Sequence, residues 1–168
     1  MIVLGIDPGN SNTGFSVVEN NGEGLRVLDW GVIRPSPSQD YPLKLKTIFD
    51  GLTTVLGRHP VDGVVIENIF FAENAKTALK LGQVRGVAIL AGASSGVRVF
   101  EYSALQIKKS VVGYGRASKE QVREMIRRLF KIEVKTIPFD ASDALAAAVC
   151  HINLFSFNER VARAGKQK

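Results

Sequence analysis

An uninterrupted apolar run in the middle of the chain, Val64-Val65-Ile66, constrains the fold more than any other feature. A strand with one face in solvent alternates apolar and polar residues, whereas a continuous run is typical of a strand buried on both faces of a parallel sheet. The run ends at Glu67, and an acid beside the core is costly unless a partner or a metal ion holds it. We therefore expect an α/β sheet whose buried strand ends in a carboxylate that needs a partner.

The segments around this run predict a mixed sheet. Three short, largely apolar segments come first, at 2–6, 13–18 and 25–33, and the Gly/Asn clusters between them predict strands joined by tight turns. Strands and helices then alternate. We expect strands at 61–67 and 97–102 and helices at 43–56, 74–93, 103–111, 118–131 and 140–155. This order predicts an α/β domain with a mixed five-stranded sheet flanked by helices.

Length and composition limit the chain to one compact domain. A chain of 168 residues, 45% of them hydrophobic, is long enough to bury a core and too short for two ordinary domains. We place the domain at 1–155 and expect 156–168 to form a basic, flexible tail. The single cysteine, Cys150, excludes a disulfide framework and favours a reducing cytoplasm. No apolar stretch reaches the ~20 residues of a membrane helix, and the N-terminus does not resemble a signal peptide.

Positive charge is concentrated in the second half of the chain. Residues 1–75 carry 5 basic and 9 acidic side chains, whereas residues 76–168 carry 17 basic and 7 acidic ones. Such a basic half favours a polyanionic partner, although a solvated face that binds nothing also explains it. Four basic residues repeat every four positions on the 118–131 helix and form a stripe about 18 Å long, which suits a run of phosphates. They are Lys119, Arg123, Arg127 and Lys131.

Four acids are expected to gather in one place. Asp7 ends the first strand and Glu67 ends the buried strand, so both emerge at one edge if the two strands are parallel neighbours. Asp140 and Asp143 lie three residues apart at the start of the last helix and share one of its faces. Packing of that helix across the sheet edge would complete the cluster. Carboxylates so placed select Mg²⁺ or Mn²⁺, and two such ions stabilise the attacking and leaving oxygens of a phosphodiester.

Each of these features also has a purely structural interpretation. Asp140 is a good helix N-cap, Asp143 suits the helix dipole, and Asp7 before Pro8-Gly9 is an ordinary turn residue. His59 and His151 have no ligand partner at a recognisable spacing, and we expect both to be structural or surface residues.

Small residues recur at four-residue intervals on the 74–93 helix, at Ala78, Gly82 and Gly86. Such a face permits another helix to approach closely, so a two-fold dimer could form there. Internal packing of this face against the sheet is the alternative.

Four segments of the chain, together covering about residues 1–155, resemble the RuvC family of bacterial Holliday-junction resolvases in order and spacing. They are GIDPGNSNTG, VVIENIFFAENAKTALKLGQVRGV, VFEYSALQIKKSVVGYGRASKEQV and DASDALAAAVCH. The resemblance implies a ribonuclease H-like fold and a homodimer. It also implies an Mg²⁺-dependent endonuclease that nicks two opposing strands of a four-way DNA junction during recombination and repair. The branch-migration proteins RuvA and RuvB are the partners it implies.

The same resemblance assigns roles to individual positions. The four acids match the family's metal ligands, and Phe70 matches an aromatic residue used against unpaired bases at the junction centre. From the residues alone, Phe70 would be a core residue or a hydrophobic staple. Lys108 and Lys119 match basic positions near the scissile phosphate, and Lys109 is a neighbouring alternative to Lys108. The expected reaction is attack of an activated water on phosphorus, which expels the 3′ oxygen and leaves a 5′ phosphate.

Three other functions remain open from the sequence. A non-catalytic junction-binding protein would use the same basic surface, but four acids facing DNA would weaken its binding in the absence of metal. GIDPGNSNTG loosely resembles the phosphate loop of actin-like ATPases, which need two such domains, more than 168 residues allow. A nuclease that acts on RNA would have the same fold and a different substrate.

Overall fold

The computed structural model describes the backbone of residues 1–68, 74–132 and 137–165. One five-stranded sheet, in the order β3-β2-β1-β4-β5, forms its centre. The first three strands are antiparallel neighbours, and β4 and β5 continue the sheet in parallel with β1. The predicted mixed α/β sheet is therefore confirmed. The strands are β1 (Ile2–Asp7), β2 (Thr13–Asn20), β3 (Leu25–Ile33), β4 (Gly63–Asn68) and β5 (Val99–Ser103), and the helices are α1 (Tyr41–Arg58), α2 (Ala75–Ser94), α3 (Ala104–Val112), α4 (Lys119–Phe130) and α5 (Phe139–Gly165).

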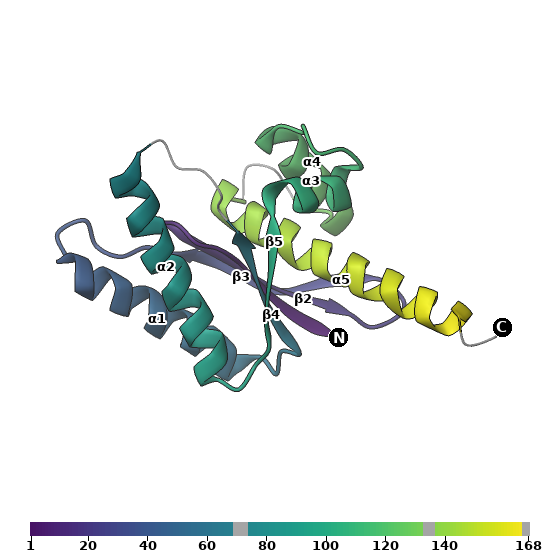
Figure 1. The fold of residues 1–168 in the computed structure, drawn as a ribbon, viewed down its shortest axis with the longest axis horizontal. Helices are drawn as coiled ribbons and strands as arrows, with labels where there is room; N and C mark the ends of the chain where they lie inside the picture. The colour runs from purple at the N-terminus through teal and green to yellow at the C-terminus, as the bar shows by residue number, and fades with distance from the viewer. Residues whose placement is uncertain (69–73, 133–136, 166–168) are drawn as a thin grey trace.

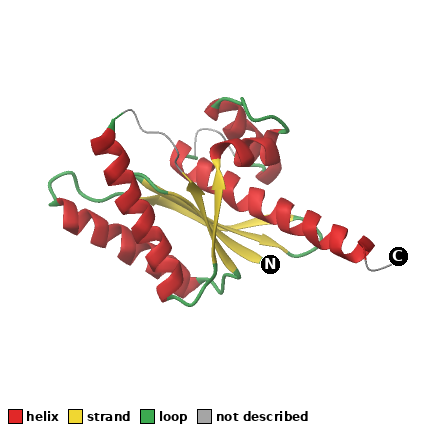
Figure 2. Ribbon diagram, in the orientation of Figure 1, coloured by secondary structure: helices red, strands yellow, loops and turns green. Residues whose placement is uncertain are grey.

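Helices cover both faces of this sheet (Figures 1 and 2). The helices α1 and α2 pack side by side on one face, and α5 crosses the other face with α3 and α4 against its first half. Successive side chains of a strand point to opposite faces. Leu4 and Ile6 of β1 accordingly belong to the apolar cluster under α1 and α2, while Val3 belongs to the cluster under α5. By the same alternation, Asp7 and Glu67 lie on the α5 face.

Two glycines allow α5 to lie directly on the backbone of the sheet. A Cβ atom at Gly5 would collide with the carbonyl oxygen of Ala144, and one at Gly14 would collide with that of Asp140. Gly14 is also the register partner of Asp7 in the β1–β2 pair. The start of α5 is thereby held beside the end of β1. The helix thus crosses the face of the sheet, and the predicted packing across its edge is wrong.

The predicted limits of the last helix are wrong at its far end. The helix was expected to stop near residue 155, but α5 continues to Gly165. The segment 156–164 contains no glycine or proline, and elongation of an existing helix requires only one further hydrogen bond per residue. At the other end the amide of Ser142 donates to the carbonyl oxygen of Pro138. Asp140 therefore lies in the first turn of α5 and is not its N-cap.

One face of α2 is open to solvent in this chain. Leu79 and Leu90 are 71% and 55% exposed, and a Cβ atom at Gly82 or Gly86 would meet no other atom. The opposite face of α2, which includes Val84, is buried against α1 and the sheet. The alternative that the small residues pack internally is therefore wrong.

Both histidines have structural partners, as predicted. His59 Nε2 lies 3.3 Å from Asp29 Oδ2, and His151 Nδ1 lies 2.9 Å from the hydroxyl of Tyr102. Across the residues whose structure is described, no helix combines the length and apolar character needed to cross a membrane.

Candidate active site

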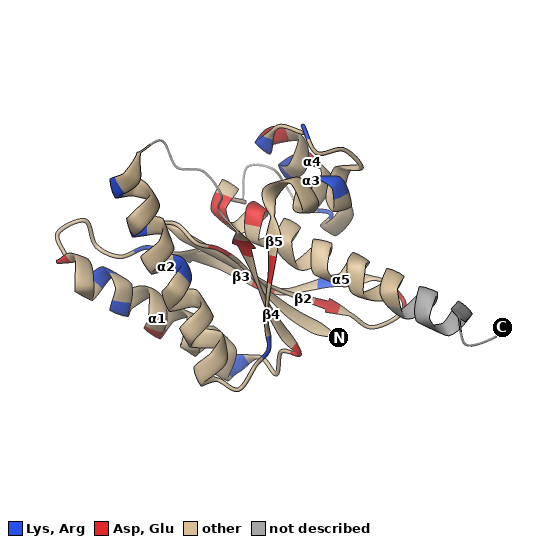
Figure 3. Ribbon diagram, viewed as in Figure 1, with Lys and Arg blue, Asp and Glu red and all other residues tan. Residues whose placement is uncertain are grey.

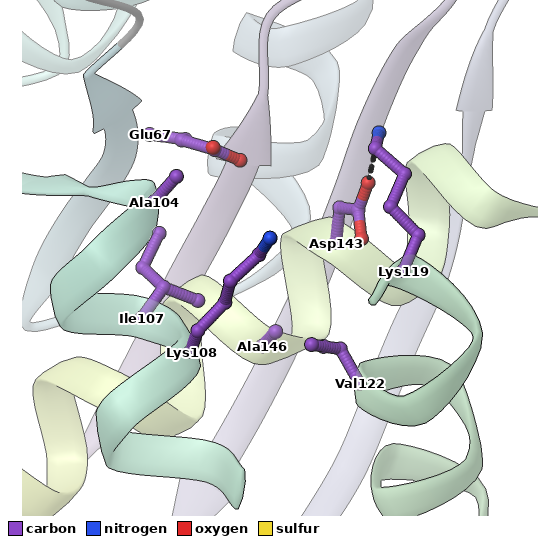
Figure 4. A pocket seen from close by; sticks show the side chains of 8 residues that line it. All are labelled: Glu67, Ala104, Ile107, Lys108, Lys119, Val122, Asp143 and Ala146. Atoms are coloured by element: carbon purple, nitrogen blue, oxygen red, sulfur yellow. Dashed lines mark hydrogen bonds and ion pairs between the residues drawn. The ribbon is translucent and has the colours of Figure 1, made fainter. Parts of the chain in front are cut away.

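A small cavity opens where the carboxyl ends of the parallel strands meet the first turns of α5, α3 and α4. Its volume is about 50 Å³. Figure 4 shows Glu67 from β4 on one side of this space, Asp143 from α5 with Lys119 from α4 on the other, and Lys108 from α3 pointing between them. Open α/β sheets place their ligand sites at this edge. The lining residues are Glu67, Ala104, Ile107, Lys108, Lys119, Val122, Asp143 and Ala146.

The acids at the cavity disfavour one another's ionised form. Burial, followed by the charges of Asp143 and Glu67, raises the pKa of Asp7 to about 8, and Asp140 acts in the same direction. Burial is also the main cause of the raised pKa of Glu67, and Asp143 is its next largest cause. The pKa of Asp143 is likewise raised, chiefly by burial. The structure therefore brings all four predicted acids within electrostatic reach, in a place short of positive charge.

Two lysines supply part of the missing positive charge. Lys119 Nζ donates to Asp143 Oδ2 at 2.8 Å, and this hydrogen bond is the main cause of the raised pKa of Lys119. Lys108 makes no such contact with the acids in the described structure, but its charge lowers the pKa of both Glu67 and Asp143. Figure 3 shows the wider pattern, with acidic residues at the strand ends and the start of α5, and basic residues on α3 and α4 beside them.

Helix caps determine where α3 and α4 begin, and therefore which face of its helix each lysine occupies. Ser103 ends β5, caps α3 and forms a reciprocal capping box with Gln106. Ser118 does the same for α4 with Gln121, which makes Lys119 the first residue of that helix. With α3 fixed in this way, Lys108 lines the cavity while the adjacent Lys109 is exposed. The structure thus distinguishes the two neighbouring lysines that the sequence left as alternatives.

The donor set fits a hard divalent cation. It consists of carboxylate oxygens, which Mg²⁺ and Mn²⁺ prefer, and a cation would relieve the repulsion that raises the pKa values of the acids. These carboxylates do not form a preformed metal-binding cluster. Among the described residues, no three Asp, Glu, His or Cys side chains are grouped closely enough to hold a metal ion. Glu67 and Asp143 instead face each other across the cavity, and Lys119 engages Asp143.

Two residues of the basic stripe of α4 have side-chain partners within the protein. Arg123 stacks on the ring of Phe139, with its Cζ atom 3.8 Å from the ring centroid. Arg127 donates two hydrogen bonds to Glu124, at 2.8 and 2.9 Å. Lys131 is the C-cap, with a left-handed φ of 55°. Phe70, the predicted base-stacking residue, lies outside the described residues.

Sequence reasoning missed two contributors to this site. Gly14 determines how closely α5 approaches Asp7, and a glycine inside a predicted strand is a known signal for close backbone approach. Phe139 immediately precedes Asp140, yet its ring is 37% exposed and belongs to neither apolar cluster. The signal available in the sequence for Phe139 was its position next to Asp140, a candidate metal ligand.

The comparison with protein families decides which family the chain belongs to. Residues 3–151 match the family model described as crossover junction endodeoxyribonuclease RuvC. The chain belongs to the RuvC family. The matched range contains all four acids and both cavity lysines.

Individual RuvC proteins match over nearly the whole chain. A crossover junction endodeoxyribonuclease RuvC from Pelobacter propionicus is 50% identical over 153 residues, which cover 91% of this chain and 86% of that protein. The protein of the same name from Geobacter sulfurreducens is 47% identical over 153 residues, covering 91% and 93%.

Solved structures confirm the ribonuclease H-like fold that the resemblance implied. Thermus thermophilus RuvC in complex with a Holliday junction substrate matches with a TM-score of 0.87 at 31% identity, covering 94% of this chain and 96% of that one. The yeast mitochondrial Holliday junction resolvase Ydc2 shares the fold, with a TM-score of 0.71 at 14% identity over 98% and 85% of the two chains.

Proposed function

We propose that this protein is a divalent-metal-dependent endonuclease that resolves four-way DNA junctions by paired symmetric nicks, in recombination and repair. The observation that carries the proposal is the electrostatic coupling of Asp7 to Glu67, Asp140 and Asp143 beside the cavity that Glu67 and Asp143 line, inside the range matched by the RuvC family. The proposed reaction is the one named in the description of the family, and the proposed substrate is the junction bound in the Thermus complex.

The four acids would hold Mg²⁺, with Mn²⁺ as a substitute and two ions per site. A bound ion supplies Lewis acidity, which activates a water for attack on phosphorus and neutralises charge on the phosphate. Asp7 must lose its proton to act as a ligand. Because the pKa of Asp7 is raised to about 8, metal affinity should increase as the pH rises toward that value.

Lys108 and Lys119 would contact the phosphate and stabilise the charge that develops on its non-bridging oxygens. Lys108 points toward the space between Glu67 and Asp143, and Lys119 lines the cavity beside Asp143, to which it donates a hydrogen bond. Expulsion of the 3′ oxygen then leaves a 5′ phosphate on the product. Arg127 remains a proposed phosphate contact outside the cavity, and Phe70 remains a proposed contact to an unpaired base.

A homodimer would place one site at each of two equivalent strands of the junction. The open face of α2 suits this role, since Leu79, Gly82, Gly86 and Leu90 fall on one helical row, with small residues between two exposed leucines. Leu79→Glu should therefore give monomers in sedimentation equilibrium, and a variant that stayed dimeric would remove α2 from the interface. We also propose that the protein works in the cytoplasm and receives junctions from RuvA and RuvB.

The test is cleavage of a labelled four-way junction with and without Mg²⁺, beside a linear duplex and an RNA–DNA hybrid. We expect paired nicks that carry 5′ phosphates on the junction alone. Asp7→Asn should still bind the junction without cleaving it. Tight binding without cleavage under any divalent metal would favour an architectural role, and cleavage of the hybrid alone would replace the substrate.

A further inference from the structure

Two contacts connect α4 to the first turns of α5 at the rim of the cavity. Lys119 Nζ donates to Asp143 Oδ2 at 2.8 Å, and the guanidinium of Arg123 lies over the ring of Phe139, 3.8 Å from its centroid. Lys119 and Arg123 are four residues apart, and so are Phe139 and Asp143. Each pair therefore shares one face of its helix. The earlier residue on α4 contacts the later residue on α5, and the later residue on α4 contacts the earlier one on α5. The two helices therefore run antiparallel where they touch.

The stack acts on the part of α5 that carries the acids. Phe139 is the first residue of α5 and Asp140 is the second. On the sheet side, the carbonyl of Asp140 lies directly over Gly14, so β2 limits movement in that direction. On the α4 side, the contact is made by the planar guanidinium of Arg123, which is attracted to the face of an aromatic ring. The first turn of α5 is thus held between the sheet and Arg123.

We propose that Arg123 is a positioning residue whose stacking on Phe139 fixes the start of α5 against α4. It thereby sets the positions of Asp140 and Asp143 relative to Lys119. This role replaces the phosphate contact that the helical stripe predicted for Arg123. The inference rests on the proposed function of the acidic site, because it concerns the placement of that site's acids.

The two side chains allow the stack to be removed from either partner. Phe139→Leu keeps an apolar side chain and removes the ring, and Arg123→Lys keeps the charge and removes the planar group. Phe139→Tyr keeps the ring and is the conservative rescue. Arg128→Lys is the matched control, since Arg128 lies on the same helix, is 70% exposed and pairs with Glu124.

The primary measurement is Mn²⁺ binding to the DNA-free protein by calorimetry, followed by junction affinity in EDTA and by kcat. Loss of the stack should weaken Mn²⁺ binding on the order of tenfold, as substitutions behind metal ligands do. We expect this loss and a lower kcat in Phe139→Leu and Arg123→Lys, with junction affinity unchanged. The double variant should lose no more than either single variant, because both changes remove the same contact. Phe139→Tyr and Arg128→Lys should bind Mn²⁺ as the unaltered protein does.

Other outcomes separate the inference from the proposed function. If Arg123→Lys or Arg123→Ala weakened junction binding while Phe139→Leu changed nothing, Arg123 would be a phosphate contact and the positioning role would be overturned. A lower melting temperature with unaltered Mn²⁺ affinity would also overturn it, because the stack would then serve stability alone. Failure of the unaltered protein itself to bind Mn²⁺ would overturn the proposed metal site, and the inference with it.

Discussion

The face of the sheet under α1 and α2 and the face under α5 differ in how their strands end. Under α1 and α2, β1 and β4 contribute apolar side chains to a cluster that includes Ile48 and Leu52, and the last residue of β4 on this face is the uncharged Asn68. Under α5 the same strands begin with Val3 and Val65 in an apolar cluster. The last residues that they place on this face, however, are Asp7 and Glu67, whose pKa values are raised by burial. Under α1 and α2, β1 and β4 therefore bury no acid. Under α5, the carboxyl ends of these strands lose stability because two acids are buried there close together.

The two faces also differ in how closely their helices approach. On the α5 face, Gly5 and Gly14 let the helix backbone touch the strands, and the facing side of α5 is a row of alanines. On the other face, larger side chains separate the helices from the sheet. Close approach is what the acids require, because Asp140 and Asp143 must reach the ends of β1 and β4. The site therefore depends on small residues that contribute little hydrophobic stability themselves.

The largest expected effect comes from removing one buried leucine from each face. Leu52→Ala in α1 and Leu145→Ala in α5 each delete a fully buried side chain. Each should lower the free energy of unfolding by about 2–5 kcal/mol, through lost burial and a residual cavity. Junction cleavage at a temperature where both variants are folded should separate them. We expect Leu52→Ala to keep its activity and Leu145→Ala, two residues from Asp143, to lose part of it. Equal activity would show that the two faces are equivalent.

Gly14→Ala tests the close approach itself. The added methyl would meet the backbone carbonyl of Asp140, so α5 must move away from Asp7. We expect a loss of about 1–3 kcal/mol of unfolding free energy, as for an overpacked core, together with a large loss of cleavage. Gly57→Ala is the control, because Gly57 lies in α1 with open space beside it and should gain up to about 1 kcal/mol. Full cleavage by Gly14→Ala would mean that α5 is not positioned by this contact.

A smaller effect is expected from a polar contact between β5 and α5, outside the lining of the cavity. The Tyr102 hydroxyl lies 2.9 Å from Nδ1 of His151, which is buried. Tyr102→Phe should cost about 1 kcal/mol in urea unfolding, the usual value for one internal hydrogen bond. Cleavage should be unchanged, since this contact belongs to the packing of α5 and not to the cavity. A loss of cleavage would extend the site along the helix.

Local sequence patterns predicted the elements and the acids, because both are determined over short distances. Strand and helix periodicities located all ten elements, and the acids were identified by their places at the ends of those elements. Helical spacing also showed which basic residues share a row on α4. It could not show that tertiary packing gives Arg123 an aromatic partner on α5, whereas the partner of Arg127, Glu124, lies three residues away on the same helix.

Other features depended on distant parts of the chain and were not predicted. The path of α5 over the face of the sheet follows from Gly5 and Gly14, which lie more than 120 residues before it. The resemblance alone favours Lys108 over Lys109, but that Lys108 lines the cavity depends on how α3 packs against α5 and β4. The length of α5 differs from the prediction for a local reason, because a polar segment without glycine or proline can prolong an existing helix.

The measurement that tests the central claim most directly compares the unfolding free energy of the unaltered protein and Asp7→Asn, in EDTA and in saturating Mg²⁺. The raised pKa of Asp7 means that the folded state disfavours its charge. In EDTA at pH 7 the variant should therefore be more stable by about 2–4 kcal/mol, and this advantage should vanish as the pH falls toward 4.

Saturating Mg²⁺ should offset this difference in stability. At one hundred times its Kd, the ion should add about 2.7 kcal/mol to the unaltered protein and little to Asp7→Asn. The gap seen in EDTA should then close. If Asp7→Asn were no more stable in EDTA, and if Mg²⁺ left the unaltered protein unchanged, the acids would not be a strained cluster that a divalent cation relieves.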